Sequence, residues 1–85
     1  MLVVDFLEQK GGKPVGTYYL NKDTRHNPNG DNEVHLSTCK FMPSDENKLY
    51  LGVFSNGVQA VQHAKMLGYD KADGCIHCAS EAHHS

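Results

Sequence analysis

Two short motifs, one near the middle of the chain and one near its end, constrain most strongly what this sequence can fold into. The first is His-Leu-Ser-Thr-Cys at residues 35–39, and the second is Cys-Ile-His-Cys at residues 75–78. Zinc in a structural site takes four thiolate or imidazole ligands, and two short-range pairs are the usual way to supply them. We therefore expect both motifs to bind one Zn²⁺, through His35, Cys39, Cys75 and Cys78.

The spacing of the first motif predicts its backbone. In an extended strand, His35 and Cys39 would lie about 13 Å apart, at about 3.3 Å per residue. A turn-like or helical step brings the two Cβ atoms to within about 6 Å. We therefore predict a turn across Leu36, Ser37 and Thr38. Four protein ligands leave no open coordination position, so the site is expected to be structural and the protein not to be an enzyme.

Other interpretations of these residues remain open. His83 or His84, a few residues beyond Cys78, can replace His35 as the fourth ligand, whereas His77 would be strained to share the ion. Three unrelated reduced cysteines, packed as small apolar residues, are the alternative without a metal. A redox pair at Cys75 and Cys78 is a further alternative, but the βαβ pattern of such sites is absent. The spacings also lack the Glu and Pro of a zinc deaminase and the His that follows a c-type haem motif.

The size of the chain makes a stabilising metal reasonable. Eighty-five residues form one small domain, and a hydrophobic fraction of 39% without tryptophan predicts a thin core. Three cysteines cannot all pair in disulfides, and the first residues lack the pattern of a secretory signal. No apolar run is long enough for a membrane span. We expect a cytoplasmic monomer in which the thiols stay reduced.

Charge gives no positive support for nucleic-acid binding. The net charge is −2, and the eight basic residues are scattered singly among ten acidic ones. Three thiolates and one Zn²⁺ would add about one more negative charge. Nucleic-acid binders usually carry a basic patch instead. The expected partner is therefore an unknown protein or nucleic acid, with no membrane.

Patterning along the chain predicts an α+β fold, a small antiparallel sheet with one main helix, stapled by zinc. Residues 1–33 are expected to form a hairpin and a loop: strands at 2–7 and 15–20, then a polar surface loop at 21–33 with a solvated His26. The alternative for the start is a mobile extension of about thirteen residues. Residues 34–78 are expected to form the metal-binding core, and residues 79–85 a tail.

Within that core, Leu49, Leu51 and Val53 alternate with other residues and predict a strand. A helix is expected over residues 56–67, capped by Ser55 and ended by Gly68. Apolar residues recur on its inner face at Val58, Val61, Ala64 and Leu67, while His63 and Met66 are expected to be surface or packing residues. Asp73-Gly74 is expected to form a tight turn before the second motif.

The order of these features resembles a known family. A ligand pair, a polar link, a strand, a helix with Gln59-Ala60, then Gly68-Tyr69 and a Cys-x-x-Cys pair follow one another over residues 34–78. This order is similar to the metal-binding N-terminal domain of the Ada DNA-alkylation response protein and to short bacterial proteins with a similar end. The resemblance implies an α+β zinc module, in which the first two ligands are His35 and Cys39 and the last two are Cys75 and Cys78.

The chain departs from that family at the first ligand position. The Ada domain has there the cysteine that accepts a methyl group from a phosphotriester, whereas this chain has His35. Related domains with histidine at this position imply that zinc binding is retained while methyl transfer is lost. We therefore expect a non-enzymatic zinc-binding interaction module. A DNA-binding or repair-associated domain without methyl-acceptor activity is the alternative.

Overall fold

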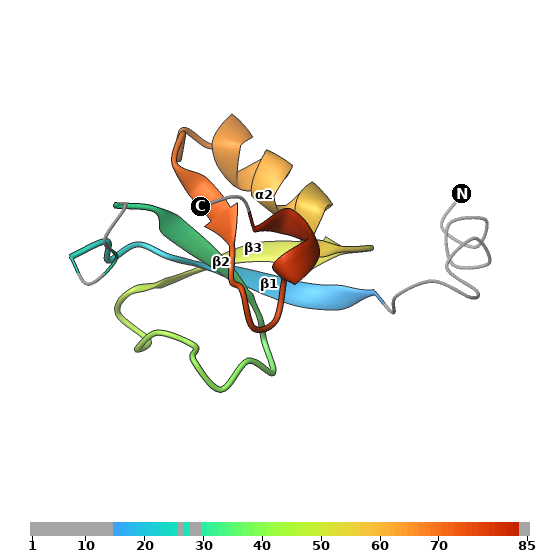
Figure 1. The fold of residues 1–85 in the computed structure, drawn as a ribbon, viewed down its shortest axis with the longest axis horizontal. Coiled ribbons are helices and arrows are strands. Elements are labelled where there is room, and N and C mark those ends of the chain that lie inside the picture. The colour runs from blue at the N-terminus through green and yellow to red at the C-terminus, as the bar shows by residue number, and fades with distance from the viewer. Residues whose placement is uncertain (1–14, 26, 28–29, 84–85) are drawn as a thin grey trace.

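A mixed sheet and one α-helix make up most of the computed structural model, which describes residues 15–25, 27 and 30–83. The strands are β1 (Gly16–Asn21), β2 (Asn32–Leu36), β3 (Lys48–Phe54) and β4 (Ala72–Gly74). The helix is α2 (Gly57–Met66), and a single 3-10 turn, η1 (Ser80–Ala82), lies near the C-terminus. The predicted α+β class is confirmed (Figure 1). No helix in the described ranges has the length and apolar character to cross a membrane.

The strand order is β3-β1-β2-β4. The sequence predicts an antiparallel sheet, whereas the observed sheet is mixed. β1 pairs antiparallel with β2 and with β3, whereas β4 pairs parallel with β2. The parallel pair arises because the chain crosses through β3 and α2 before it returns beside β2, and parallel neighbours need such a crossover.

The predicted N-terminal hairpin is only partly described. Its second strand is present as β1, while residues 2–7 lie outside the described residues. β1 is bordered by β2 on one edge and β3 on the other, so its sheet partners come from later in the chain. The polar loop is shorter than expected because Asn32 and Glu33 already belong to β2. His26 lies outside the described residues.

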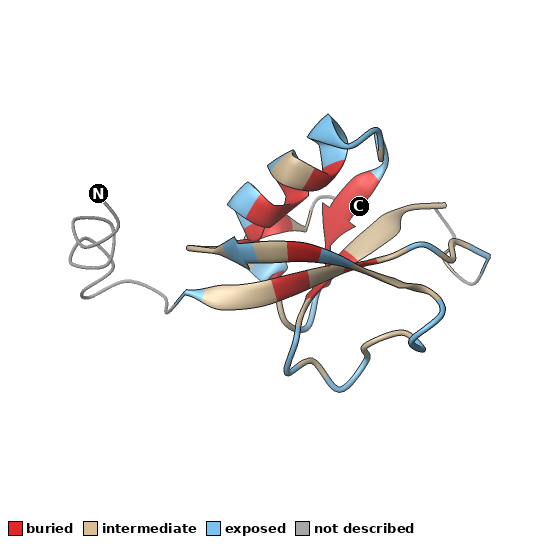
Figure 2. Ribbon diagram, turned by 180° about the vertical axis from the view of Figure 1, so that it is seen from behind, coloured by how far each residue is buried: buried red, intermediate tan, exposed pale blue. Residues whose placement is uncertain are grey.

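The hydrophobic core lies between the sheet and α2. Figure 1 shows α2 and η1 on one side of the sheet and the segment that joins β2 to β3 on the other, and Figure 2 shows buried positions on the elements that face each other. In the described part of the chain, five of the ten residues in the buried cluster are alanines. The cluster consists of Tyr18, Leu20, Val34, Leu51, Ala60, Val61, Ala64, Ala72, Ala79 and Ala82. Because alanine buries little apolar area, the core is thin, as predicted.

The helix differs from the prediction at its start and on its inner face. Its N-cap is Asn56 and not Ser55: the Asn56 side chain accepts a hydrogen bond from Gln59 N at 3.0 Å. The buried helix positions are Gly57, Ala60, Val61 and Ala64, whereas Val58 and Leu67 are exposed. Small residues on the inner face allow α2 to lie close to the sheet.

The end of the helix follows the prediction. Gly68 has φ of +108°, a left-handed conformation that glycine adopts without steric cost. Met66 is exposed, and the His63 ring lies 5.4 Å from the ring of Phe54, which agrees with surface and packing roles.

A bulge in β3 changes which residues face the core. Tyr18 pairs with Gly52 and Tyr19 with Tyr50, so Leu51 is the extra residue. One extra residue shifts the alternation by one position. Phe54 therefore packs against the core, and Val53, predicted to share a face with Leu51, is exposed.

Asp73-Gly74 is a strand and not the predicted turn. Both residues are buried in β4, where they pair with Glu33 and Val34 of β2. This pairing with β2 overrides the local turn preference. A Cβ at position 74 would overlap the carbonyl oxygen of Ala79, so the close packing here needs glycine. The turn lies instead at residues 76–78.

Candidate metal centre

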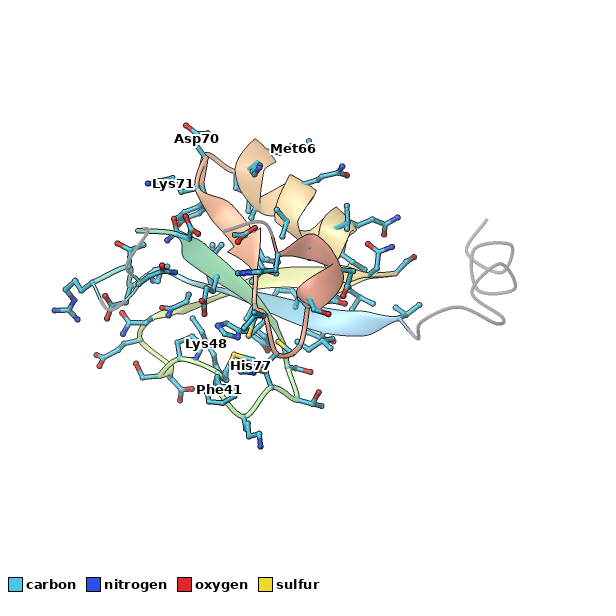
Figure 3. The ribbon with its side chains drawn as sticks, in the orientation of Figure 1. Phe41, Lys48, Met66, Asp70, Lys71 and His77 are labelled. Carbon is cyan, nitrogen blue, oxygen red and sulfur yellow. The ribbon has the colours of Figure 1, made fainter. Side chains whose placement is uncertain are left out.

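His35 reaches the site from the middle of the sheet. It lies in β2 between Val34 and Leu36, which belong to the core or pack against it. Successive residues of a strand point to opposite faces, so His35 points to the face away from α2. The residue is 1% exposed. Figure 3 shows sulfur atoms on this same side of the sheet, near the labelled Phe41 and His77.

A turn brings Cys39 back beside His35, as the four-residue spacing predicts. Ser37 and Thr38 form the turn, and Cys39 N donates to Leu36 O at 3.0 Å. Phe41 N in turn donates to Cys39 Sγ at 3.4 Å. The first hydrogen bond ties the turn to the end of β2, and the second ties the Cys39 sulfur to the loop after it.

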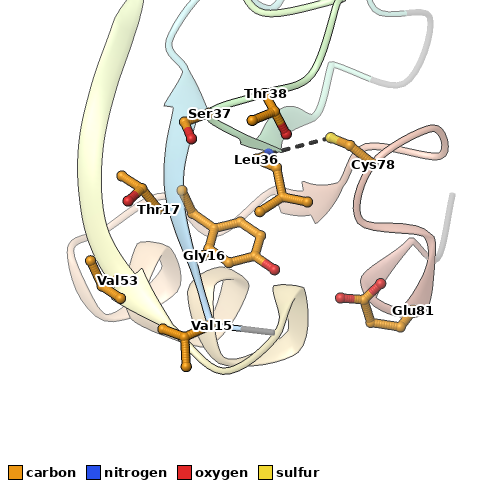
Figure 4. Close-up of a pocket in the computed structure, with 10 residues that line it drawn as sticks. Val15, Gly16, Thr17, Leu36, Ser37, Thr38, Val53, Cys78 and Glu81 are labelled. Atoms are coloured by element: carbon orange, nitrogen blue, oxygen red, sulfur yellow. Dashed lines mark hydrogen bonds between the residues drawn. The ribbon is translucent and has the colours of Figure 1, made fainter. Parts of the chain in front are cut away.

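The second ligand pair extends from β4. Cys75 N donates to Val34 O at 3.0 Å and so continues the pairing of β4 with β2. Ala79 N donates to Cys75 O at 2.8 Å and closes the loop that holds both cysteines. Cys78 Sγ accepts from Leu36 N at 3.3 Å (Figure 4). The loop is thus hydrogen-bonded to β2 at each of its two cysteines.

The four predicted ligands come together. The donor atoms of His35, Cys39, Cys75 and Cys78 all lie within 4.8 Å of one another. Cys39 Sγ is 4.0 Å from Cys75 Sγ, and Cys78 Sγ is 3.9 Å from His35 Nδ1. Two segments far apart in the sequence therefore converge on one point, and this arrangement can hold a metal ion.

The other histidines considered as ligands lie elsewhere. His83 Nδ1 is 3.0 Å from Gly74 O and 3.3 Å from Asp73 Oδ2. The His77 ring is exposed and stacks on Phe41 at 4.4 Å between centroids. Neither belongs to the cluster, and His84 lies outside the described residues.

Burial sets the protonation of the cluster. Burial, with a smaller contribution from His77, lowers the pKa of His35, which keeps the imidazole neutral. Burial also raises the pKa of the Cys75 and Cys78 thiols, although backbone N–H groups partly offset this rise. Thiolates at this place therefore need a cation to compensate their desolvation, which a divalent metal supplies.

Comparison of the chain with protein-family models, with curated proteins and with solved structures finds no match. The resemblance to the Ada domain accordingly stays a prediction. What the chain does must be inferred from its own geometry.

Two features of the site have no signal in the motifs. Glu33 Oε1 lies 3.5 Å from His35 Nε2, and the two residues share a face because they are two apart on β2. A cavity of about 440 Å³ lies beside Cys78, with Tyr18, Leu36 and Glu81 among its lining residues (Figure 4). Tyr18 and Glu81 reach it only through the tertiary fold. Of the four cluster residues, Cys78 is the one that lines this cavity, on the side of β1.

Proposed function

We propose that this protein is a non-enzymatic module whose fold is stabilised by one Zn²⁺ bound to His35, Cys39, Cys75 and Cys78. The observation that carries the proposal is the convergence of three thiols and one imidazole within 4.8 Å. Thiolate and imidazole ligands favour zinc over magnesium, calcium or manganese, which prefer oxygen. Four protein ligands complete a tetrahedral shell, so the ion would be structural.

One sulfur–sulfur distance is close to that of such a shell. Tetrahedral zinc with bonds of about 2.3 Å to sulfur places two sulfurs about 3.8 Å apart. The Cys39 and Cys75 sulfurs are 4.0 Å apart. For this pair the contraction would be about 0.2 Å, whereas donor atoms as far apart as 4.8 Å would have to approach by about 1 Å.

The test is metal content together with a matched pair of histidine variants. We expect one zinc per purified chain and, after cobalt substitution, the absorption spectrum of a tetrahedral three-sulfur, one-nitrogen site. His35→Ala, Cys39→Ala, Cys75→Ala and Cys78→Ala should lose the metal. His77→Ala removes an exposed imidazole outside the cluster and should keep it. Folded protein free of metal, or equal loss in His35→Ala and His77→Ala, would contradict the proposal.

The module would act by binding a partner beside the metal loops. Phe41 and Ile76 lie in the two ligand-bearing loops and are 52% and 56% exposed. Phe41 stacks on His77, which joins the first loop to the second. Apolar and aromatic side chains presented on rigid loops are typical of recognition surfaces. Zinc would then fix the position of this surface.

Nucleic-acid binding is the second candidate function, and one observation favours it. The exposed Lys40 adjoins the stacked Phe41 and His77, and an aromatic surface beside a cation is a feature of single-strand binding sites. Affinity for DNA measured across a salt series tests this, because phosphate contacts give a steep loss of affinity with salt. Absence of measurable binding at low salt would remove this candidate.

A further inference from the structure

His35 carries a buried nitrogen without a hydrogen-bond partner. Among the described residues, His35 Nε2 is a buried side-chain nitrogen to which no other group makes a hydrogen bond. The other ring nitrogen, Nδ1, faces the sulfur cluster at 3.9 Å from Cys78 Sγ. Buried polar groups left unpaired cost free energy, so an unpaired atom at a candidate site indicates an interaction that is completed in the functional state.

Glu33 is the group placed to complete that interaction. Its Oε1 lies 3.5 Å from His35 Nε2, slightly longer than a hydrogen bond. Both side chains project from the same face of β2, and the pairing of Glu33 with Asp73 of β4 fixes that part of the strand. The Glu33 side chain is 39% exposed, so its charge is partly solvated while the imidazole beside it is buried.

We propose that Glu33 is a positioning residue for the metal: its carboxylate accepts a hydrogen bond from His35 Nε2–H and thereby leaves the lone pair on Nδ1 for the ion. This inference rests on the proposed zinc function and adds to it a fifth residue and a defined tautomer. A carboxylate on the far nitrogen of a ligating histidine orients the ring and raises its basicity as a ligand. A movement of a few tenths of an ångström by the partly exposed Glu33 side chain toward the ring would close the hydrogen bond.

The direct test is nuclear magnetic resonance of the wild-type protein loaded with ¹¹³Cd²⁺ and labelled with ¹⁵N. We expect scalar coupling from cadmium to Nδ1 of His35, and a proton retained on Nε2. Coupling from cadmium to Nε2 would overturn the inference while leaving the metal site intact. A wild-type chain that binds no metal would overturn both proposals, so the two failures are distinguishable.

A matched set of acidic variants supplies the second test. Glu33→Ala should weaken zinc binding by about 10–100-fold, the usual effect of removing such a partner, and should speed exchange of the Nε2 proton. Glu33→Gln keeps an oxygen acceptor and should recover part of the affinity. Glu46→Gln removes an equal charge from an exposed position in the loop after Pro43 and should change neither quantity. Equal affinities and equal exchange rates in Glu33→Ala and Glu46→Gln would overturn the inference.

Discussion

At the scale of single residues, the site depends on the burial of one imidazole and of its thiols. His35 is buried in a sheet, a place where an imidazole without a partner is costly. Its pKa is lowered by burial, so the neutral ring is ready to bind a metal at pH 7. The Cys75 and Cys78 thiols have raised pKa values for the same reason. They must lose their protons before they can bind.

The imidazole is neutral before metal binds, whereas the thiols carry protons, and this difference predicts how many protons metal binding releases. At pH 7 the Cys75 and Cys78 thiols are protonated in a folded metal-free chain, where burial raises their pKa, and mainly protonated in an unfolded one, where the pKa of a thiol is about 8.5. Binding should therefore release about two protons or more per ion. Affinity should therefore rise with pH, by about a hundredfold or more per unit near neutrality, and acid should release the metal. Calorimetry in two buffers of different ionisation enthalpy measures the protons released. Heats that do not depend on the buffer would contradict this expectation.

At the scale of elements, pairing within the sheet positions the ligands and local caps position the helix. His35 lies in β2. Because β4 pairs with β2, Cys75, which directly follows β4, lies beside the end of β2 near His35. α2 lies on the other face and contributes core residues, with no ligand among the described ones. The helix therefore affects the site indirectly, through the stability of the sheet that it covers.

The N-cap of α2 provides a test at this scale. Asn56→Ala should lower the free energy of unfolding by about 0.5–2 kcal/mol, because the N–H of Gln59 loses its acceptor. Gln62→Ala changes an exposed amide on the same helix and should have a much smaller effect. Denaturant unfolding of the two variants under identical metal conditions measures the difference. If both variants unfold at the same denaturant concentration, Asn56 is not an effective cap.

At the scale of the whole molecule, the core alone is small for an independent domain. Half of its described members are alanines. The four residues of the candidate metal cluster lie in β2, the loop after it and the segment after β4. A metal at this point would add to the backbone hydrogen bonds and the Phe41–His77 stack that already connect these segments. Structural zinc in small domains contributes about 10–16 kcal/mol in apparent stability, as much as the whole stability of many domains.

Chelation should therefore unfold the protein. We expect a strong chelator at pH 7 to abolish the native circular dichroism and the dispersion of amide resonances, and zinc but not magnesium to restore both. A metal-free protein with an unchanged spectrum and dispersed resonances would show that the core suffices without the ion. It would also exclude the structural role proposed for the site.

The amino-acid sequence by itself determined the four residues of the candidate metal cluster, the turn after His35, the existence of β1, β3 and α2, and the glycine that ends the helix. These follow from spacing, alternation and backbone preference, which are local properties of the chain. Only the tertiary structure decided that Asp73-Gly74 is a buried parallel strand, that Leu51 is a bulge, that Asn56 caps α2 and that Glu33 lies beside His35. Each of these depends on packing between segments distant in sequence, and such packing overrides the preference of a dipeptide or a single side chain.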